Sequence, residues 1–244
     1  MYRNVVKEKD MSTKPKMSND WLEKLLTNHE EWVGMKSENG QCRIEDVIIE
    51  EFDFSSYNLT EAAFHNVTFK DCTFGDTRVW AAAFITCDFS TCHFAGAEFW
   101  EATIAGSTFN GCTMIGVDLQ GAKVANCTFN KCRFLCVLFR TATLANCQFN
   151  WSKFSSADFT DAKLNQVNFN TSFLPNVEGL FIQPDFEANY SDRDLRRLLY
   201  RTVKNAFCSI YASKELKDTL APLLPFVNES DLAEEYGDIT ERRK

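Results

Sequence analysis

Cysteine is the residue type in this sequence best suited to chemistry, because a thiolate binds metal ions and takes part in redox reactions. The chain holds ten cysteines in 244 residues, and four of them lie in the stretch ANCTFNKCRFLCVLFRTATLANCQF, residues 125–149. A phenylalanine stands two residues after Cys127, Cys132 and Cys147. Tetrahedral zinc sites favour tight CxxC or HxxxH pairs, and the sequence contains neither. The spacing therefore favours packing over metal or redox chemistry for these thiols.

Sequence motifs of catalysis are also missing. The chain has no GxGxxG or GxxxxGK[ST] phosphate-binding loop, no HExxH zinc helix and no GxSxG nucleophile turn. The three histidines, His29, His65 and His93, are far apart, and HEEW at 29–32 lacks the second histidine of a zinc site. We interpret His29 as part of a solvated helix surface. We expect a protein that is not an enzyme and that binds no cofactor or metal.

Charge and hydropathy limit which partners the protein can bind and where in the cell we expect it. The formal net charge is −8 and the pI is near 5.0, which argues against direct binding of nucleic acid, because such binding needs a concentrated basic surface. No apolar run is long enough to span a membrane, and the N-terminus lacks the apolar core of a secretory signal. We expect a cytoplasmic protein whose partner is another protein.

Large apolar residues recur at every fifth position from Ile44 to Leu174, and this beat accounts for the cysteines. The centre of each five is most often Phe, of which the chain has 22. The position two residues before each centre is small, and eight of the ten cysteines occupy it. Neither a helix of period 3.6 nor a strand of period 2 gives a beat of five. A chain that turns two apolar residues inward and then rounds a corner does, so we expect these thiols to lie in the core.

The beat resembles that of the pentapeptide repeat family. AEF at 97–99, VDL at 117–119 and ADF at 157–159 match the A(D/N)L consensus or its Phe variant. The resemblance implies an all-β solenoid, a right-handed quadrilateral β-helix with four pentapeptides per turn, in which residues twenty apart stack. One column of thiols would then consist of Cys72, Cys92, Cys112 and Cys132. One aromatic ladder would consist of Phe69, Phe89, Phe109, Phe129, Phe149 and Phe169.

The chain divides into five segments around the repeat. Residues 1–18 are polar and are expected to be disordered. Residues 19–40 are expected to form a capping helix, with Gly34 as its stop. Its apolar set is Trp21, Leu22, Leu25, Leu26 and Trp32. The β-helix takes residues 41–174, a linker and C-terminal helices take 175–228, and a charged tail takes 229–244. A solenoid leaves open strand edges, so we expect helices to cap both ends.

The C-terminal segment has a second possible role beside capping. One predicted helix face carries Leu195, Leu198, Leu199, Val203 and Ile210. This face would close the solenoid, and it could also pair two copies end to end into a homodimer, as in some members of the family. Amphipathicity alone does not separate these two roles. Two thiols fall outside the repeat pattern, Cys136 at an outward corner and Cys208 on a predicted helix.

The coil rule gathers carboxylates on one side of the solenoid. The acidic protein-binding face that we predict consists of Glu61, Glu98, Glu101, Asp118, Asp158 and Asp161. The resemblance implies mimicry of DNA, because related proteins that act on type II topoisomerases occupy the basic DNA saddle of gyrase. The predicted partner is therefore DNA gyrase or another DNA-handling enzyme. Arg78 and Arg140 interrupt this face, and the unbroken frame has no room for the loops of fluoroquinolone-resistance members. Charges that only keep the rod soluble remain an alternative.

Two tryptophans suggest a competing function. Trp80 and Trp100 are twenty residues apart and point outward, so they should stack on the same side as the carboxylates. Exposed tryptophans bordered by charge are typical anchors of protein interfaces. The alternative function is an interaction scaffold or secreted bacterial effector that binds a partner through Trp80, Trp100 and the C-terminal helices. Whether terminal helices or a second copy cover these rings stays open.

Overall fold

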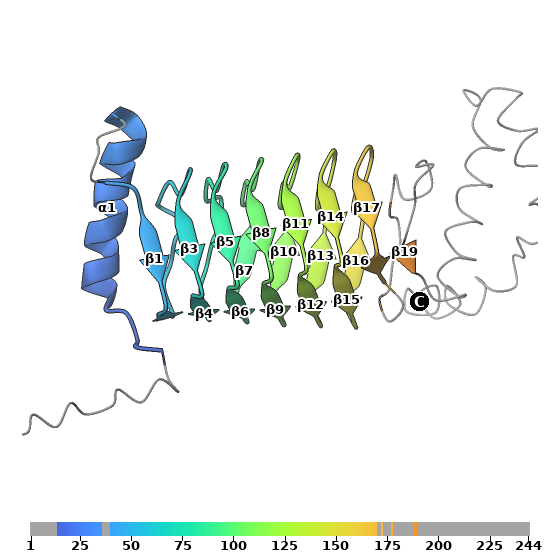
Figure 1. The fold of residues 1–244 in the computed structure, drawn as a ribbon, viewed down its shortest axis with the longest axis horizontal. Coiled ribbons are helices and arrows are strands. Elements are labelled where there is room, and N and C mark those ends of the chain that lie inside the picture. The colour runs from blue at the N-terminus through green and yellow to red at the C-terminus, as the bar shows by residue number, and fades with distance from the viewer. Residues whose placement is uncertain (1–13, 36–39, 170–171, 173–176, 178–187, 190–244) are drawn as a thin grey trace, which may run out of the picture.

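The computed structural model describes residues 14–35, 40–169, 172, 177 and 188–189. The chain winds into a rod of stacked coils, with one helix lying across the N-terminal end (Figure 1). Each strand of the repeat pairs in parallel with the strand twenty residues further on, as Phe69 does with Phe89. The same register holds from Arg43 with Ala63 to Gln148 with Asn168. The predicted quadrilateral β-helix is therefore confirmed.

The rod has four sides, three of which are sheets of short strands. The seven-stranded side consists of β1 Arg43–Glu45, β3 Ala63–His65, β5 Ala83–Ile85, β8 Thr103–Ala105, β11 Lys123–Ala125, β14 Thr143–Ala145 and β17 Lys163–Asn165. The four-stranded side consists of β7 His93–Ala95, β10 Thr113–Ile115, β13 Arg133–Leu135 and β16 Lys153–Ser155. The eight-stranded side consists of β2 Ile48–Glu50, β4 Thr68–Lys70, β6 Asp88–Ser90, β9 Thr108–Asn110, β12 Thr128–Asn130, β15 Gln148–Asn150, β18 Val167–Asn168 and β19 Ala188–Asn189. Isolated parallel bridges form the bridged side, along Asn58, Arg78, Glu98, Asp118, Leu138 and Asp158.

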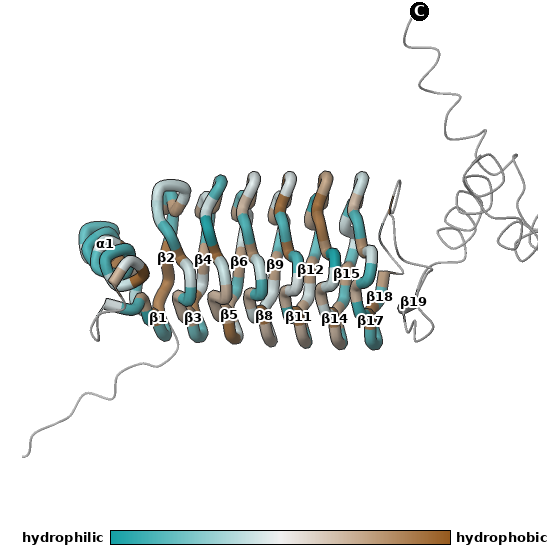
Figure 2. Tube along the Cα trace, turned by 90° about the horizontal axis from the view of Figure 1, so that it is seen from above, coloured by the Kyte–Doolittle hydropathy of each residue, from teal (hydrophilic) through white to brown (hydrophobic). Residues whose placement is uncertain are grey.

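The corners between the sides have left-handed backbone angles. Asn66, Asp71 and Trp151 lie at φ values of 54°, 53° and 55°, and glycines such as Gly106 take equivalent positions. Asparagine, aspartate and glycine adopt this region most readily, which explains the turn-forming residues of the repeat. Between corners, the coils stack into straight rows (Figure 2). The side chains of each row therefore point in one direction along the whole rod.

Phenylalanine rings and small residues fill the inside of the rod. Phe109 stacks on Phe129, and Phe129 on Phe149, each pair with ring centroids 4.7 Å apart. The eight thiols of the repeat are buried, and those from Cys72 onward donate hydrogen bonds to main-chain carbonyls, as Cys132 Sγ does to Phe109 O at 3.4 Å. The prediction that the cysteines belong to the core is confirmed. Cys136 is exposed at its corner, as expected.

The N-terminal end is capped by α1, Asn19–Met35, and by the residues before it. Leu22 and Leu26 are buried against the rod. The backbone N–H of Cys42 donates to His29 Nδ1 at 3.0 Å, and the backbone N–H of Asn58 donates to Glu30 Oε1 at 3.2 Å. These bonds satisfy donors that the first coil would otherwise expose at its edge. The predicted capping helix is therefore confirmed.

Four details of this end differ from the sequence-based expectations. Lys16 bridges Ile48, and Met17 N–H donates to Ile48 O at 2.8 Å, so residues 14–18 extend the eight-stranded side instead of being disordered. His29 is buried and its Nδ1 accepts the bond from Cys42 N–H, so it is not a solvated surface residue. Trp21 points away from the rod and is 54% exposed. Gly34 lies inside α1, which ends one residue later.

At the other end, the separation between paired residues of successive coils increases by one residue. Val167 pairs with Ala188, a separation of twenty-one residues, so β19 continues the eight-stranded side with an altered register. The expected C-terminal helices, including Leu195, Leu198, Leu199, Val203 and Ile210, and the charged tail lie outside the described residues. Among the described residues, no helix has the length and apolar character needed to cross a membrane.

Candidate protein-binding face

The bridged side and its adjoining corner carry the predicted acidic and aromatic binding residues. Inward residues such as Val79 and Phe99 leave their neighbours on either side pointing out, because alternate residues of an extended chain face opposite directions. Arg78, Glu98 and Asp118 therefore form one outward row, connected by parallel bridges. A second outward row includes Trp80, Trp100, Gln120 and Arg140. The adjoining corner adds Glu61, Glu101 and Asp161, which are exposed.

Trp80 and Trp100 form a rigid aromatic platform. Their rings stack with centroids 5.0 Å apart and planes 7° apart. Trp80 Nε1 donates a hydrogen bond to Glu98 Oε2 at 2.8 Å, and the Arg78 guanidinium carbon lies 5.8 Å from the Trp80 ring centroid. Trp100 is 40% exposed and forms the accessible end of the stack. Because neighbouring groups already fix both rings, little side-chain entropy would be lost when a partner packs on them.

The six predicted carboxylates do not behave alike. Glu61, Glu101 and Asp161 are exposed at the corner, and Glu98 and Asp118 are half-buried in the outward row. Asp158 is only 6% exposed, in contrast to the prediction of an accessible charge. It pairs with Arg140 and accepts a hydrogen bond from Thr160 N–H at 2.8 Å. Burial favours a higher pKa for Asp158, but the bonds from Thr160 and Arg140 outweigh it and lower the pKa. Asp158 therefore makes contacts within the rod and is not available to a partner.

Most of the buried thiols are held in the protonated form. Burial raises the pKa of Cys42 and of Cys127 to about 12 each. In the four-thiol column, the hydrogen bond with Cys92 and burial raise the pKa of Cys72 above its ordinary range. The hydrogen bond with Cys112 lowers the pKa of Cys132, which accepts it at the end of the column. A buried protonated thiol is a poor nucleophile and a poor ligand. The described residues contain no group of three or more potential metal ligands.

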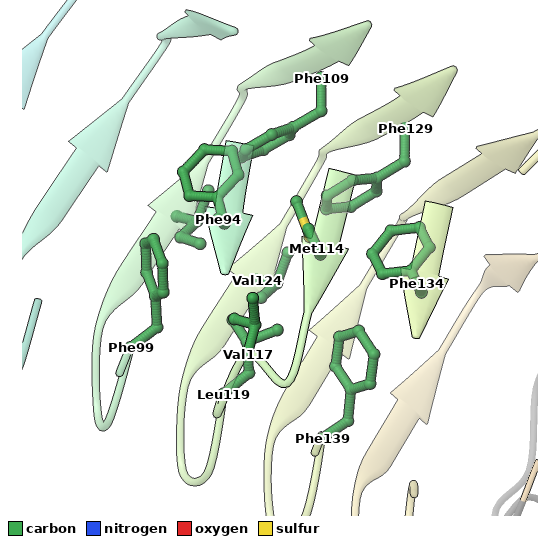
Figure 3. Close-up of a pocket in the computed structure, with 11 residues that line it drawn as sticks. Phe94, Phe99, Phe109, Met114, Val117, Leu119, Val124, Phe129, Phe134 and Phe139 are labelled. Atoms are coloured by element: carbon green, nitrogen blue, oxygen red, sulfur yellow. The ribbon is translucent and has the colours of Figure 1, made fainter. Parts of the chain in front are cut away.

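A narrow cavity lies inside the rod, where smaller residues interrupt the phenylalanines. Its volume is about 20 Å³, and apolar side chains line it (Figure 3). The lining residues are Phe94, Phe99, Ile104, Phe109, Met114, Val117, Leu119, Val124, Phe129, Phe134 and Phe139. No hydrogen-bonding side chain points into this space. The cavity offers no groups for catalysis, so the outer surface is the candidate for function.

Two contacts that organise this face were not predicted from the sequence. Trp80 bonds to Glu98 and Arg140 pairs with Asp158, and in both pairs the residues are eighteen apart. The residue after one centre thus contacts the residue before the corresponding centre of the next coil. This spacing was visible in the sequence, since the coil repeat of twenty and the strand positions around each centre were already predicted. By this spacing, Asp158 pairs with Arg140 within the rod, and Glu98 fixes the Trp80 ring while it stays half-buried at the surface.

Comparisons with known proteins agree with the repeat. A sequence model described as pentapeptide repeats matches residues 92–130 and 132–170 in eight copies. No curated protein sequence matches the chain. Full-length QnrB1, a plasmid-mediated fluoroquinolone resistance protein, matches structurally at 16% identity over 67% of this chain and 99% of its own, with TM-score 0.28. HetL, involved in heterocyst differentiation regulation in the cyanobacterium Nostoc, matches at 12% identity over 64% and 96%, with TM-score 0.21. Residues 92–130 and 132–170 therefore match the pentapeptide repeat model, and the same coils of twenty residues extend from this stretch back to Arg43 in the described rod.

Proposed function

We propose that this is a non-enzymatic cytoplasmic protein that binds a protein partner by imitating the charge of duplex DNA. The imitating part is the N-terminal section of the rod, residues 43–118. The partner that best fits is an enzyme with a basic DNA-binding surface, and DNA gyrase is the first enzyme to test. The acidic and aromatic residues of the bridged side form the centre of the contact.

The charge density of this section carries the proposal. Residues 43–118 contain twelve carboxylates and three basic side chains, so their formal net charge is −9. Each twenty-residue coil advances by one strand spacing, so the section is about 18 Å long at about 4.8 Å per coil. The rod thus carries one net negative charge about every 2 Å, against about 1.7 Å for duplex DNA. Residues 119–169 hold two acids and six bases, so the imitation is confined to the N-terminal section.

The bridged side supplies both charge and an anchor. Glu61, Glu98, Glu101 and Asp118 lie on it within three coils. Complementary charge mainly accelerates and orients docking, whereas a packed aromatic residue slows dissociation. The stacked Trp100, bordered by Glu98 and Glu101, therefore provides a place where an arginine or lysine of the partner meets both a ring face and a carboxylate.

The proposal is tested by binding to gyrase and by gyrase supercoiling activity. The triple change Glu98→Lys, Glu101→Lys and Asp118→Lys should weaken binding at least about tenfold, since three attractive contacts become repulsive. The matched control is Glu45→Lys, Glu51→Lys and Asp88→Lys, which alters net charge equally on other sides of the rod. Binding should also weaken steeply with added salt. Equal binding by the wild type and the first triple variant would reject mimicry through this side.

A scaffold anchored by the aromatic pair is the second candidate function. The observation that favours it is the fixed geometry of Trp80 and Trp100, which does not depend on net charge. The change Trp100→Ser should then remove binding to the partner, and added salt should have little effect. Mimicry predicts the opposite order, with the carboxylates and salt dominant. A protein partner captured from the host would be compared with gyrase in both measurements.

A further inference from the structure

The four-stranded side of the rod has a charge and size pattern that the proposed function does not use. With the first two coils included, one outward row reads Asp53, Thr73, His93, Thr113, Arg133 and Lys153. The next outward row reads Ser55, Gly75, Ala95, Ile115, Leu135 and Ser155. The adjoining corner reads Glu51, Asp71, Thr91, Gly111, Lys131 and Trp151. Acidic and small residues occupy the N-terminal half, and basic and large residues the C-terminal half.

The C-terminal half of this side carries features that are unfavourable in an isolated chain. Arg133 and Lys153 are register neighbours, and like charges directly opposite each other destabilise a sheet. No carboxylate among the described residues pairs with Lys131, Arg133 or Lys153. Trp151 is 67% exposed and has a φ of 55°, a region that bulky residues rarely adopt. An acidic partner surface would offset the charges of Lys131, Arg133 and Lys153, and contact with it would remove part of the Trp151 ring from water.

We propose that this partner surface is the same side of a second copy, in an antiparallel dimer. In a face-to-face pair, the two-fold axis lies in the contact plane and here runs across the rods. Each outward row then faces itself with its order reversed. With the axis midway between the rows of His93 and Thr113, Asp53 faces Lys153 of the second copy. At the corner, Asp71 faces Lys131 of the second copy.

In the same register, large residues of one copy face small residues of the other. Gly75 faces Leu135 of the second copy, and Ala95 faces Ile115 of the second copy. Leu135 is half-buried, and Ile115 is 41% exposed in the single chain. Opposite each of these aliphatic side chains the second copy presents a residue with one side-chain carbon or none. The large residues of one copy thus fill the space that the small residues of the other leave.

The other sides of the rod do not match themselves in this way. On the bridged side, the equivalent axis brings Glu98 against Asp118, which is repulsive. On the seven-stranded side, Arg43 meets Lys163. On the eight-stranded side, Asp88 meets Thr128, so no opposite charges meet there. The four-stranded side is thus the side whose own charges select an antiparallel copy.

The size of the contact sets its strength. Six coils spaced about 4.8 Å apart, each with a strand about 10 Å long, give a footprint of about 300 Å² per copy. A stable dimer usually buries about 800 Å² per partner. The proposed dimer is therefore weak and reversible, with charge pairs that make it sensitive to salt.

Sedimentation equilibrium of the full chain over a concentration series tests the proposal. The double change Lys131→Glu and Lys153→Glu places carboxylates opposite Asp71 and Asp53, so the dimer dissociation constant should rise about tenfold or more. The matched control, Lys123→Glu with Lys163→Glu, makes the same charge change on the seven-stranded side and should leave dimerisation unchanged. Adding Asp53→Lys and Asp71→Lys to the first double variant should restore it. High salt should weaken the wild-type dimer.

Disulfide trapping gives a second measurement that also reads the register. In a Cys136→Ser background, Ser55→Cys with Ser155→Cys should yield a covalent dimer on oxidation, because these positions face each other across the axis. The pair Glu45→Cys with Asn165→Cys on the seven-stranded side should not. A chain that stays monomeric at millimolar concentration would overturn the proposal. So would a dimer that is unaffected by Lys131→Glu with Lys153→Glu, which would point to the C-terminal segment instead.

Discussion

Phe94 and Phe134 lie two coils apart in one row, and Met114 separates them (Figure 3). On either side of this gap the row is aromatic: Phe74 stacks on Phe94 at 4.8 Å, and Phe134 on Phe154 at 4.4 Å. The cavity of about 20 Å³ adjoins Met114. We expect Met114→Phe to join the two stacks and fill this space. Each of the two new stacked pairs contributes about 0.5–1.5 kcal/mol, so the free energy of unfolding in urea should rise by about 1–3 kcal/mol.

The matched variant for this experiment is Met114→Ala. It enlarges the cavity, and loss of a buried methionine side chain costs about 2–5 kcal/mol. If Met114→Phe instead lowered the free energy of unfolding by more than about 1 kcal/mol, overpacking would be the cause. The space beside Met114 would then be too small or too rigid for a ring.

Thiol labelling should separate Cys136 from the rest of the repeat. Cys136 is exposed, whereas the other eight cysteines among the described residues are buried. A disulfide reagent should therefore modify Cys136 rapidly in the folded protein, and the change Cys136→Ser should reduce the rapid phase by one thiol. The buried thiols should react only after unfolding in urea. Rapid labelling of Cys127 or Cys132 without denaturant would contradict a closed lumen.

Alkaline pH should destabilise the fold through the buried thiols. Burial raises the pKa of Cys127 to about 12 and of Cys147 to about 11, above the usual value of about 8.5. Between these values the unfolded chain has lost its thiol protons and the folded chain has kept them. Stability therefore falls as pH rises from about 9 to 11, by about 1.4 kcal/mol per pH unit for each thiol.

The variant Cys127→Ala with Cys147→Ala isolates this effect. Alanine takes the same small position at Ala62 and Ala142, so the substitution suits the coil. Urea unfolding at pH 8 and pH 10 should show a smaller loss of stability for the variant than for the wild type. Equal losses would mean that tyrosine or lysine titration, and not the thiols, governs alkaline unfolding.

The solenoid was predictable because each pentapeptide repeats the same pattern of residue types. A large residue such as Phe109 and a small one such as Ser107 point inward, and a turn former such as Gly111 rounds the corner. The same pattern in the next five residues forms another side and corner of the coil, so a local pattern determines the whole fold. The position of Trp80 beside Trp100 followed from this rule alone.

Contacts between unlike elements were not predictable in this way. α1 has apolar residues around much of its surface, and only its docking against the first coil decides that Leu22 is buried while Trp21 is exposed. The sequence predicts a surface position for His29, but its partner is a backbone N–H thirteen residues later, which no side-chain pattern marks. The sequence likewise predicts an accessible charge for Asp158, but its pairing with Arg140 depends on the direction of side chains between neighbouring coils.

The cap offers a test in which adjacent residues have opposite roles. Leu22 is buried between α1 and the rod, so Leu22→Asp would place a carboxylate in an apolar contact and detach the helix. The first coil would then lose the bonds from Cys42 to His29 and from Asn58 to Glu30, and an open strand edge promotes association. We expect large oligomers by light scattering and a loss of about 3 kcal/mol or more in unfolding free energy. Trp21→Asp, next in sequence but 54% exposed, should leave both quantities unchanged. A Leu22→Asp protein that remained as stable and as dispersed as the wild type would show that α1 is not what protects this end.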